Sequence, residues 1–141
     1  MYKRLLAAID RTDPIGTDLI GRRCKTLVDA SGPSIALIHV RLSLPESYVR
    51  HLPPQWEADE FIETENWLRQ IAMDHGFAAH LSDVFPPTGN VASEVTQIAT
   101  NIGADLIIVA AQRATIGRRI LGSNAHAIMR DAPCDVLIVR D

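Results

Sequence analysis

The residues with the clearest chemical potential lie near the end of this 141-residue chain, where Gly122, Ser123 and Asn124 open a predicted helix. The N-terminus of a helix carries unpaired N–H groups and a partial positive charge, so it attracts phosphate. Gly122 allows the backbone to come close to a ligand, and the Ser123 hydroxyl is predicted to cap the helix. The same residues could also form only a turn and a cap, and both interpretations are open at this point.

Two further groups of polar residues could contribute to such a site. The segment before Gly122 carries Arg113, Arg118 and Arg119, whose guanidinium groups could bind phosphate or stay in solvent. Asp10 ends the first apolar run of the chain, where its carboxylate could contact a ligand, cap the following helix or pair with an arginine. Each of these residues is a candidate with a purely structural alternative.

The sequence contains no motif of a dedicated catalytic reaction. It has neither the G-x-S-x-G pattern of a nucleophilic serine nor the G-x4-G-K-[ST] loop that cradles phosphates. No S-G-G-x-D-S signature follows the first predicted strand. The histidines fit no H-x3-H or H-E-x2-H spacing, so no metal ligands and no catalytic residues are predicted.

Four apolar runs of strand length, together with a weaker, mixed run that suits a sheet edge (78–85), must position the candidate residues, and they alternate with four stretches of helical periodicity. The predicted strands are 3–9, 34–40, 78–85, 106–111 and 135–140, and the predicted helices are 14–30, 57–75, 91–102 and 123–131. Asp13 and Asn90 are predicted N-caps, and Gly103 is predicted to end the third helix. The proline-containing segment 41–56 is interpreted as a long surface loop.

This alternation predicts an α/β fold: a single, doubly wound, five-stranded parallel sheet of order 3-2-1-4-5 with four helices. In such a sheet, ligands bind beyond the carboxyl ends of the strands, at the point where the strand order reverses. That point lies between the first and fourth strands. The predicted topology therefore places Asp10 opposite the segment 110–123.

Length and composition favour one globular domain spanning residues 1–141, with 47% hydrophobic residues and a net charge of −3. The absence of a basic run argues against a nucleic-acid partner. The start, MYKRLLAAID, is interpreted as a strand and not as a signal peptide, and no run is long enough to span a bilayer. We therefore expect no membrane partner and a cytoplasmic location, with Cys24 and Cys134 as free thiols.

Four pieces of the sequence together resemble the universal stress protein (UspA-like) family, and the resemblance covers essentially the whole chain. They are MYKRLLAAID, SIALIHV, IATNIGADLIIVA and LGSNAHAIMRDAPCDVLIVR. The last piece is the most specific, because Leu-Gly-Ser, Arg130, Ala-Pro-Cys and a valine-rich strand occur together and in order. The resemblance implies a Rossmann-like sandwich of the adenine nucleotide α-hydrolase type.

The nucleotide-binding members of that family carry the pattern G-x2-G-x9-G-[ST]. Gly122 and Ser123 match its last pair, whereas Ala110 stands at the first glycine and Gln112 or Arg113 near the second. A subgroup with a shortened loop that ends in Gly-Ser-Asn-Ala is similar to this sequence. If Ala110 had to adopt a left-handed backbone, the cost would be about 1–2 kcal/mol.

The resemblance implies that the chain binds ATP, possibly with Mg²⁺, in the crevice between the first and fourth strands. Adenine and ribose would contact Ala8, Ile9, Asp10 and Val40. Ribose and phosphates would contact Ala110, Gln112, Gly122, Ser123, Asn124 and Ala125, to which we add Arg113 for its charge and position.

The function implied by the resemblance is that of a regulatory ATP-binding module in the stress response, acting through a homodimer and an unknown protein partner. The last strand, with the apolar run 136–139, is the expected dimer edge. A protein-interaction module that has lost nucleotide binding is the first alternative, favoured by Ala110 and Gln112. A slow ATPase is the second alternative.

Overall fold

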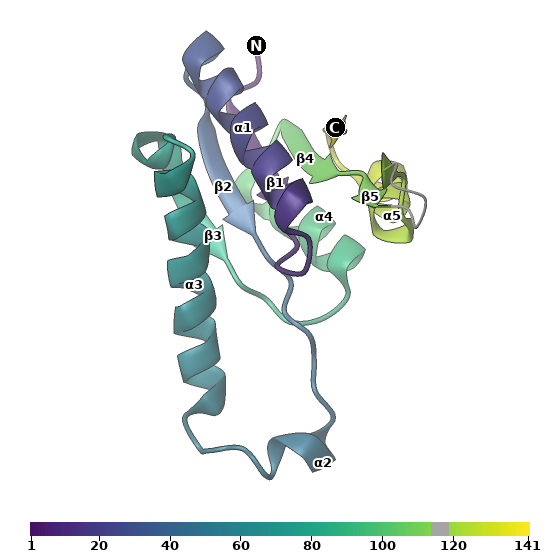
Figure 1. Ribbon diagram of the computed structural model, residues 1–141. Coiled ribbons are helices and arrows are strands. Elements are labelled where there is room, and N and C mark those ends of the chain that lie inside the picture. The colour runs from purple at the N-terminus through teal and green to yellow at the C-terminus, as the bar shows by residue number, and fades with distance from the viewer. Residues whose placement is uncertain (114–118) are drawn as a thin grey trace.

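The chain is built on a five-stranded, all-parallel sheet of order β3-β2-β1-β4-β7, as shown in Figure 1. The structure is a computed structural model that describes residues 1–113 and 119–141, without the side chains of residues 112, 113, 119 and 120. The strands are β1 (Arg4–Ala8), β2 (Ser34–Ile38), β3 (Leu81–Phe85), β4 (Leu106–Ala110) and β7 (Asp135–Val139). The sheet order and parallel pairing predicted from the sequence are confirmed.

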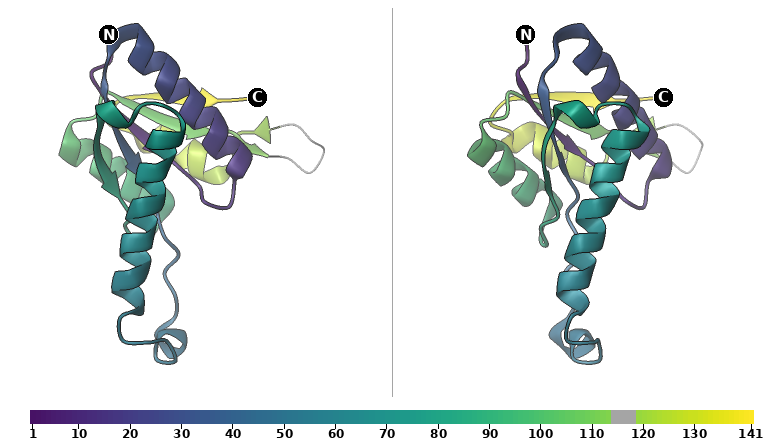
Figure 2. Two further views of the ribbon diagram at one scale, coloured as in Figure 1. Left: turned by 60° about the vertical axis from the view of Figure 1, so that its left-hand side comes forward. Right: turned by 90° about the vertical axis from the view of Figure 1, so that its left-hand side faces the viewer.

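Helices cover both faces of this sheet, so the fold has three layers (Figures 1 and 2). The four predicted helices are α1 (Pro14–Ser31), α3 (Trp56–Asp74), α4 (Val91–Ile102) and α5 (Ser123–Asp131). Leu5 and Ala7 of β1 face the core shared with α1 and α3, whereas Leu6 faces the core shared with α4 and α5. Alternate residues of one central strand thus anchor both helical layers.

Local capping explains where several of these helices begin and end. The Asp13 side chain accepts a hydrogen bond from the Gly16 N–H at 3.0 Å, and the Asn90 side chain accepts one from the Ser93 N–H at 3.0 Å. Gly103 ends α4 with φ of 68°, a left-handed conformation that favours glycine. The prediction that Ser123 caps the last helix is wrong, because Gly122 is the N-cap residue.

Three regions differ from the sequence prediction. The predicted loop 41–56 contains a one-turn helix, α2 (Glu46–Val49), so the described residues hold five α-helices and not four. A short antiparallel pair, β5 (Gln112–Arg113) with β6 (Arg119–Ile120), lies within the predicted basic loop. The predicted strand 78–85 is shorter because Ala78–His80 forms a 3₁₀ turn, η1.

Within the described residues, no helix combines the length and apolarity that crossing a bilayer requires.

The long helices α1 and α3 approach each other closely at Gly21. A Cβ atom built on Gly21 would lie 2.5 Å from the imidazole ring of His75, at the end of α3. That ring is held from both sides, since its Nδ1 lies 2.9 Å from the Ile71 carbonyl oxygen and its Nε2 lies 3.1 Å from Asp18 Oδ1. The missing side chain at Gly21 therefore makes room for an imidazole ring that cannot easily move.

The N-terminal half of α3 extends beyond the sheet, together with α2 and the connecting chain (Figures 1 and 2). Phe61, which the periodicity groups with the inward-facing residues of this helix, is 39% exposed, whereas Leu68, Ile71 and Ala72 are buried. The extension begins at the carboxyl end of β2, so it leaves the sheet at the edge where a ligand crevice is expected.

Candidate functional site

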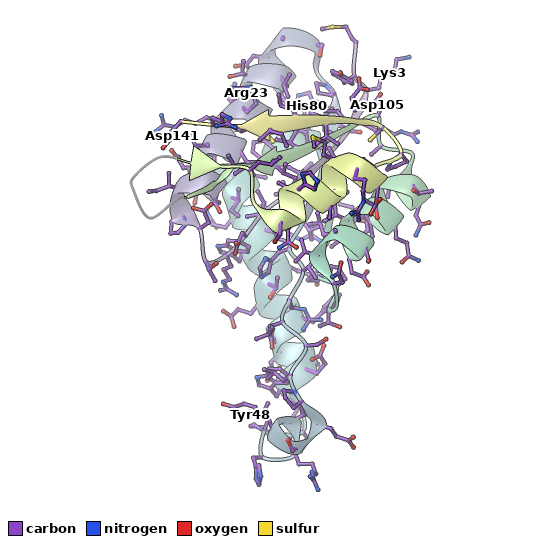
Figure 3. The ribbon with its side chains drawn as sticks, turned by 90° about the vertical axis from the view of Figure 1, so that its right-hand side faces the viewer. Lys3, Arg23, Tyr48, His80, Asp105 and Asp141 are labelled. Carbon is purple, nitrogen blue, oxygen red and sulfur yellow. The ribbon has the colours of Figure 1, made fainter. Side chains whose placement is uncertain are left out.

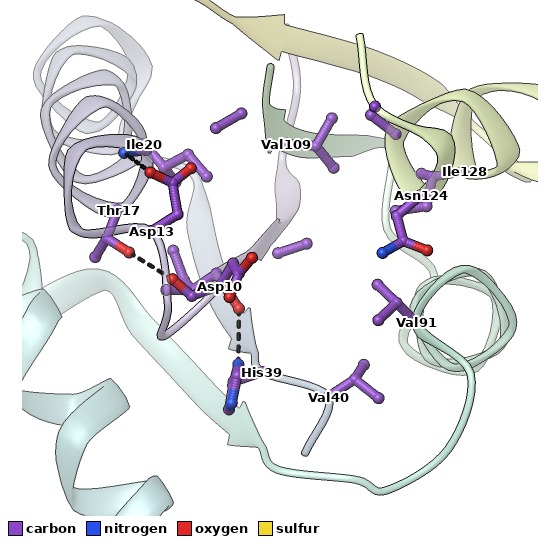
Figure 4. A pocket seen from close by; sticks show the side chains of 16 residues that line it. Asp10, Asp13, Thr17, Ile20, His39, Val40, Val91, Val109, Asn124 and Ile128 are labelled. Atoms are coloured by element: carbon purple, nitrogen blue, oxygen red, sulfur yellow. Dashed lines mark hydrogen bonds between the residues drawn. The ribbon is translucent and has the colours of Figure 1, made fainter. Parts of the chain in front are cut away.

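A cavity of about 200 Å³ lies at the carboxyl ends of β1, β2 and β4, at the point where the strand order reverses (Figure 4). Its wall is completed by the N-terminal ends of α1, α4 and α5. Eight of the predicted site residues line it: Ala8, Ile9, Asp10, Val40, Ala110, Gly122, Asn124 and Ala125. Residues separated by more than a hundred positions in the chain thus meet around one cavity.

The turn between β1 and α1 forms the acidic side of the cavity. Asp10 Oδ1 accepts hydrogen bonds from the Thr12 N–H at 2.9 Å and from the Thr12 hydroxyl at 2.7 Å. The Asp10 carbonyl oxygen accepts from the Asp13 N–H and, at 3.2 Å, from the Thr17 hydroxyl. The side chain of Asp10 therefore stabilises its own turn, while Asp13 caps α1. Neither structural role considered for Asp10 is observed, because Asp13 caps α1 and Asp10 makes no ion pair with a described side chain.

His39 fixes the same wall from the neighbouring strand. Its Nδ1 lies 3.0 Å from the carbonyl oxygen of Ile9, and since that oxygen can only accept, the contact requires a proton on Nδ1. The imidazole ring also stands edge-on to Trp67 of α3, with 5.4 Å between ring centroids. His39 is thus a positioning residue that ties the end of β1 to the end of β2.

The opposite side of the cavity is the beginning of α5. The first bond within this helix runs from the His126 N–H to the Gly122 carbonyl oxygen at 2.9 Å. The N–H groups of residues 123–125 precede that bond and have no acceptor within the helix, as at every helix start. Gly122 has φ of −79°, which other residues also adopt, so its backbone conformation does not require glycine. Asn124 faces the cavity from this side (Figure 4).

For three of the predicted site residues, the structure describes no side chain at the cavity. Ser123 is exposed and is not among the lining residues. The side chains of Gln112 and Arg113 lie outside the description, although the backbone of both residues belongs to β5. Arg118 lies outside the described residues altogether, as does the side chain of Arg119.

Ala110 lines the cavity as the last residue of β4 without backbone strain. No residue other than glycine has a positive φ in the described chain, so the possible cost of a left-handed alanine does not arise. What remains is the steric effect of one methyl group at the position where the family pattern has a glycine.

Several lining residues were not predicted from the sequence. They are Asp13, Gly16, Thr17, Ile20, His39, Val91, Val109 and Ile128. His39 and Val109 lie at or just after the carboxyl end of a strand, and the others lie at the N-cap or in the first two turns of a helix. The topological rule that selects this edge of the sheet could have found them, whereas the motif alone could not.

The cavity combines an apolar slot with two polar ends. Val40, Val91 and Val109 contribute apolar surface, which suits a flat aromatic group. Asp10 and Asp13 lie at one end, and the start of α5 lies at the other (Figure 4). No lysine or arginine among the described side chains lines the cavity. The arrangement can accept hydroxyl donors at the acidic end and an anion at the helix start, and among the described side chains it pairs no nucleophile with a base.

A five-stranded parallel sheet with a cavity at its reversal point defines a doubly wound α/β fold. A comparison with known protein families identifies the family. The model of the universal stress protein family matches residues 1–140, and the chain therefore belongs to this family. It is 29% identical to universal stress protein G of Shigella flexneri over 143 residues, which cover 99% of this chain and all of that protein.

Solved structures share the fold at lower identity. A universal stress protein in complex with cAMP has a TM-score of 0.64 and 21% identity, covering 99% of this chain and 97% of its own. The universal stress protein from Archaeoglobus fulgidus in complex with dAMP has a TM-score of 0.68 and 14% identity, covering 99% of this chain and 98% of its own. At these identities the likeness establishes the fold and its strand order.

Proposed function

We propose that this protein is a regulatory module that binds an adenine nucleotide, ATP with Mg²⁺, in the cavity between β1 and β4. One observation carries the proposal: residues from both ends of the chain, selected from the sequence as a nucleotide site, line a single cavity at the reversal point of the sheet. Two solved members of the fold, in complex with cAMP and with dAMP, support the choice of an adenine ligand.

The charges around the cavity favour one orientation of the nucleotide. Phosphates avoid the carboxylates of Asp10 and Asp13 and are attracted to the unpaired N–H groups at the start of α5. The ribose hydroxyls then lie near Asp10, and the base lies against Val40. Because the volume of about 200 Å³ is below the roughly 300–1,000 Å³ of pockets for drug-sized ligands, the phosphates extend out of the cavity toward β5 and β6.

The protein supplies few ligands of its own for Mg²⁺. Within the described residues there is no group of three or more histidine, cysteine, aspartate or glutamate side chains that could hold a metal. Mg²⁺ commonly binds through one or two carboxylates together with nucleotide phosphates and water. We therefore propose that Mg²⁺ arrives with ATP, bound to the phosphates and to water, and that its charge offsets the charge of the phosphates.

The loop that follows β4 decides between this proposal and a module without nucleotide. Its sequence resembles the subgroup with a shortened Gly-Ser-Asn-Ala ending, which also lacks the second family glycine. In this chain Ala110 stands at the first glycine, and Gln112 or Arg113 stands near the second. Because Ala110 is unstrained, its methyl group weakens close approach of the ribose without closing the cavity. We propose that binding persists at reduced affinity.

The output of nucleotide binding is proposed to be an altered protein contact and not turnover. We propose a homodimer formed through β7 at the edge of the sheet, and a further protein partner in the cytoplasm. Cys24 and Cys134 are both free, as expected of thiols in a reducing compartment. Slow ATP hydrolysis remains the alternative in which the same cavity positions a water molecule.

Thermal unfolding with and without ATP and Mg²⁺ tests the proposal. Nucleotide at 100 times its Kd stabilises a folded protein by about 2.7 kcal/mol. At roughly 2–4 °C per kcal/mol for a domain near this size, the melting temperature should rise by about 5–10 °C. GTP at the same concentration is the matched control and should raise it less. No shift with millimolar ATP would favour the nucleotide-free module, and steady phosphate release would favour the ATPase.

A further inference from the structure

A long segment projects from the body of the protein without a core of its own. We call residues 42–63 the arm; it comprises α2, the connections on either side and the first turns of α3. Not one residue of the arm is buried. Figures 1 and 2 show the arm extending away from the sheet, and Figure 3 shows Tyr48 near its far end. Both sides of the arm are therefore accessible to another molecule.

The arm carries large apolar side chains that are exposed to solvent. Half of the exposed large apolar residues in the described chain belong to it, namely Leu42, Tyr48, Val49, Phe61 and Ile62. Leu42 is 78% exposed, Tyr48 60% and Ile62 54%. Isolated exposed apolar residues are common, but a concentration of them on one projection marks an interaction surface.

The arm is also strongly acidic. Five carboxylates, those of Glu46, Glu57, Asp59, Glu60 and Glu63, lie along it with a single arginine, Arg50. Some of this charge is compensated from the body of the protein, because Arg41 pairs with Glu57 at 2.9 Å and Arg11 pairs with Glu63 at 2.8 Å. Among the described side chains, neither Glu46 nor Asp59 makes an ion pair. The outer part of the arm thus presents uncompensated negative charge beside apolar groups.

The arm is held firmly at its base. The guanidinium of Arg41, 5% exposed, donates from Nε to the Pro86 carbonyl oxygen at 2.7 Å, pairs with Glu57 and lies over the ring of Phe61. Arg11 joins the turn beside the cavity to α3 through Glu63 and the ring of Trp67. Because these arginine contacts fix the base of the arm, its surface is preformed, and binding a partner costs little conformational entropy.

We infer that the arm is a docking surface for a basic amphipathic segment of another protein, one that presents lysine or arginine beside large apolar side chains. Charge complementarity selects this partner chemistry, because such a segment would pair with Glu46 and Asp59 while covering Tyr48 and Ile62. The length of the arm matches the roughly 20–30 residues that one side of a standard protein interface contributes.

The same charges disfavour the other occupants. Two copies of the arm would bring like charges together, and an anionic lipid surface would be repelled. Docking on the arm does not require nucleotide in the cavity. The test therefore omits ATP, and its outcome is independent of whether the cavity binds a nucleotide.

The probe is a fluorescein-labelled helical peptide of leucine and lysine, with the leucines on one face, titrated with the full chain at low salt and followed by fluorescence anisotropy. We expect saturable binding that weakens about tenfold or more in the double variant Tyr48→Ser, Ile62→Ser, since a few large side chains carry most of an interface. In the double variant Glu46→Gln, Asp59→Asn, we expect weaker binding and a smaller dependence on salt. These positions are exposed, so the variants should fold normally.

Met129→Ser is the matched apolar control, because Met129 is 47% exposed on α5, outside the arm, and its substitution should leave peptide binding unchanged. The inference is overturned if this control weakens binding as much as the arm variants do. It is equally overturned if a peptide with glutamate in place of lysine binds as tightly. If sedimentation shows self-association of the wild type that the arm variants abolish, the occupant is a second copy and the inference is wrong.

Discussion

Asn124 occupies the second position of α5, where a negative charge would act in opposite directions on the helix and on a bound phosphate. Asn124→Asp should stabilise the helix start by roughly 0.3–1 kcal/mol, because an acid there complements the helix dipole. The same charge should weaken ATP binding at least tenfold, equivalent to about 1.4 kcal/mol. Isothermal titration with ATP and thermal unfolding of the free protein measure the two effects separately.

Asn101→Asp is the control for this change, since it adds the same charge at an exposed position of α4, at the helix end away from the cavity. Unchanged ATP affinity in Asn124→Asp would mean that the phosphates do not lie at the start of α5.

Cys24 is a second residue whose surroundings give a directional prediction. Its thiol is fully buried between α1 and the sheet, and burial raises its pKa to about 12 from the ordinary 9.0. Between these values the unfolded chain loses the proton that the folded protein keeps. The contribution of Cys24 to stability is therefore complete below pH 9 and falls above it by up to about 1.4 kcal/mol per pH unit.

Urea unfolding at a series of pH values between 8 and 10.5 measures this dependence. The variant Cys24→Ala should be somewhat less stable at pH 8 but should lose stability less steeply above pH 9. Parallel pH profiles for the two proteins would show that the thiol of Cys24 ionises equally easily in the folded and unfolded states.

The roles of residues that interact only with their neighbours in the chain were predictable from the sequence. Asp13 and Asn90 cap helices as expected because the cap depends only on the next three residues. Ser123 does not cap, because the extended backbone that a cap requires occurs one residue earlier. His39 could not be recognised as a wall of the cavity, since its role depends on Ile9 and Trp67, which are distant in sequence.

At the scale of elements, the contact between α1 and α3 predicts an unusual effect of a glycine substitution. In an exposed helix interior, replacing glycine by alanine stabilises by about 0.8–1.0 kcal/mol. Gly21→Ala should instead destabilise the protein, because its methyl group would lie 2.5 Å from the His75 ring and overpacking typically costs about 1–3 kcal/mol.

Chemical denaturation of Gly21→Ala, alone and in a His75→Ala background, checks this. With the imidazole removed, the alanine should recover its stabilising effect, so the two substitutions should be strongly non-additive. Stabilisation by Gly21→Ala in the otherwise unchanged protein would contradict the close contact.

The elements that the sequence predicted well are those with strong periodicity. Four of the five strands, β1, β2, β4 and β7, are short, mainly apolar runs, so hydrophobic pattern alone located them. The edge strand β3 is mixed, with Ser82 and Asp83 exposed, and it begins three residues later than predicted. The helix α2 was missed because its four residues bury nothing and leave no apolar period. The pair β5 and β6 was missed because two-residue strands depend on their pairing and not on composition.

At the scale of the whole molecule, the exposed edge of β7 gives a prediction about assembly. The hydrogen bond from the Ala111 N–H to the Val139 carbonyl oxygen fixes the register, so Val136 and Ile138 direct their backbone N–H groups away from β4. If the dimer forms by pairing of these edges, Val136→Pro should abolish it, because it removes an outward donor and no bond to β4.

Analytical ultracentrifugation over a range of concentrations should find a dimer for the wild type and a monomer for Val136→Pro. Asp141→Pro, an exposed substitution just beyond the strand, is the control and should remain dimeric. A Val136→Pro protein that sediments as a dimer would show that the copies meet elsewhere.

The central place of β1 in the sheet has a consequence for biosynthesis. This strand is synthesised before the other strands of the sheet, yet it lies between β2 and β4, and β4 follows it by about a hundred residues. Until then one edge of β1 lacks its partner, and the cavity lacks the wall that α5 supplies. Contacts so distant in sequence form slowly. A nascent chain that lacks α5 therefore has an incomplete cavity, and a ligand of the cavity can stabilise only the chain in which α5 is in place.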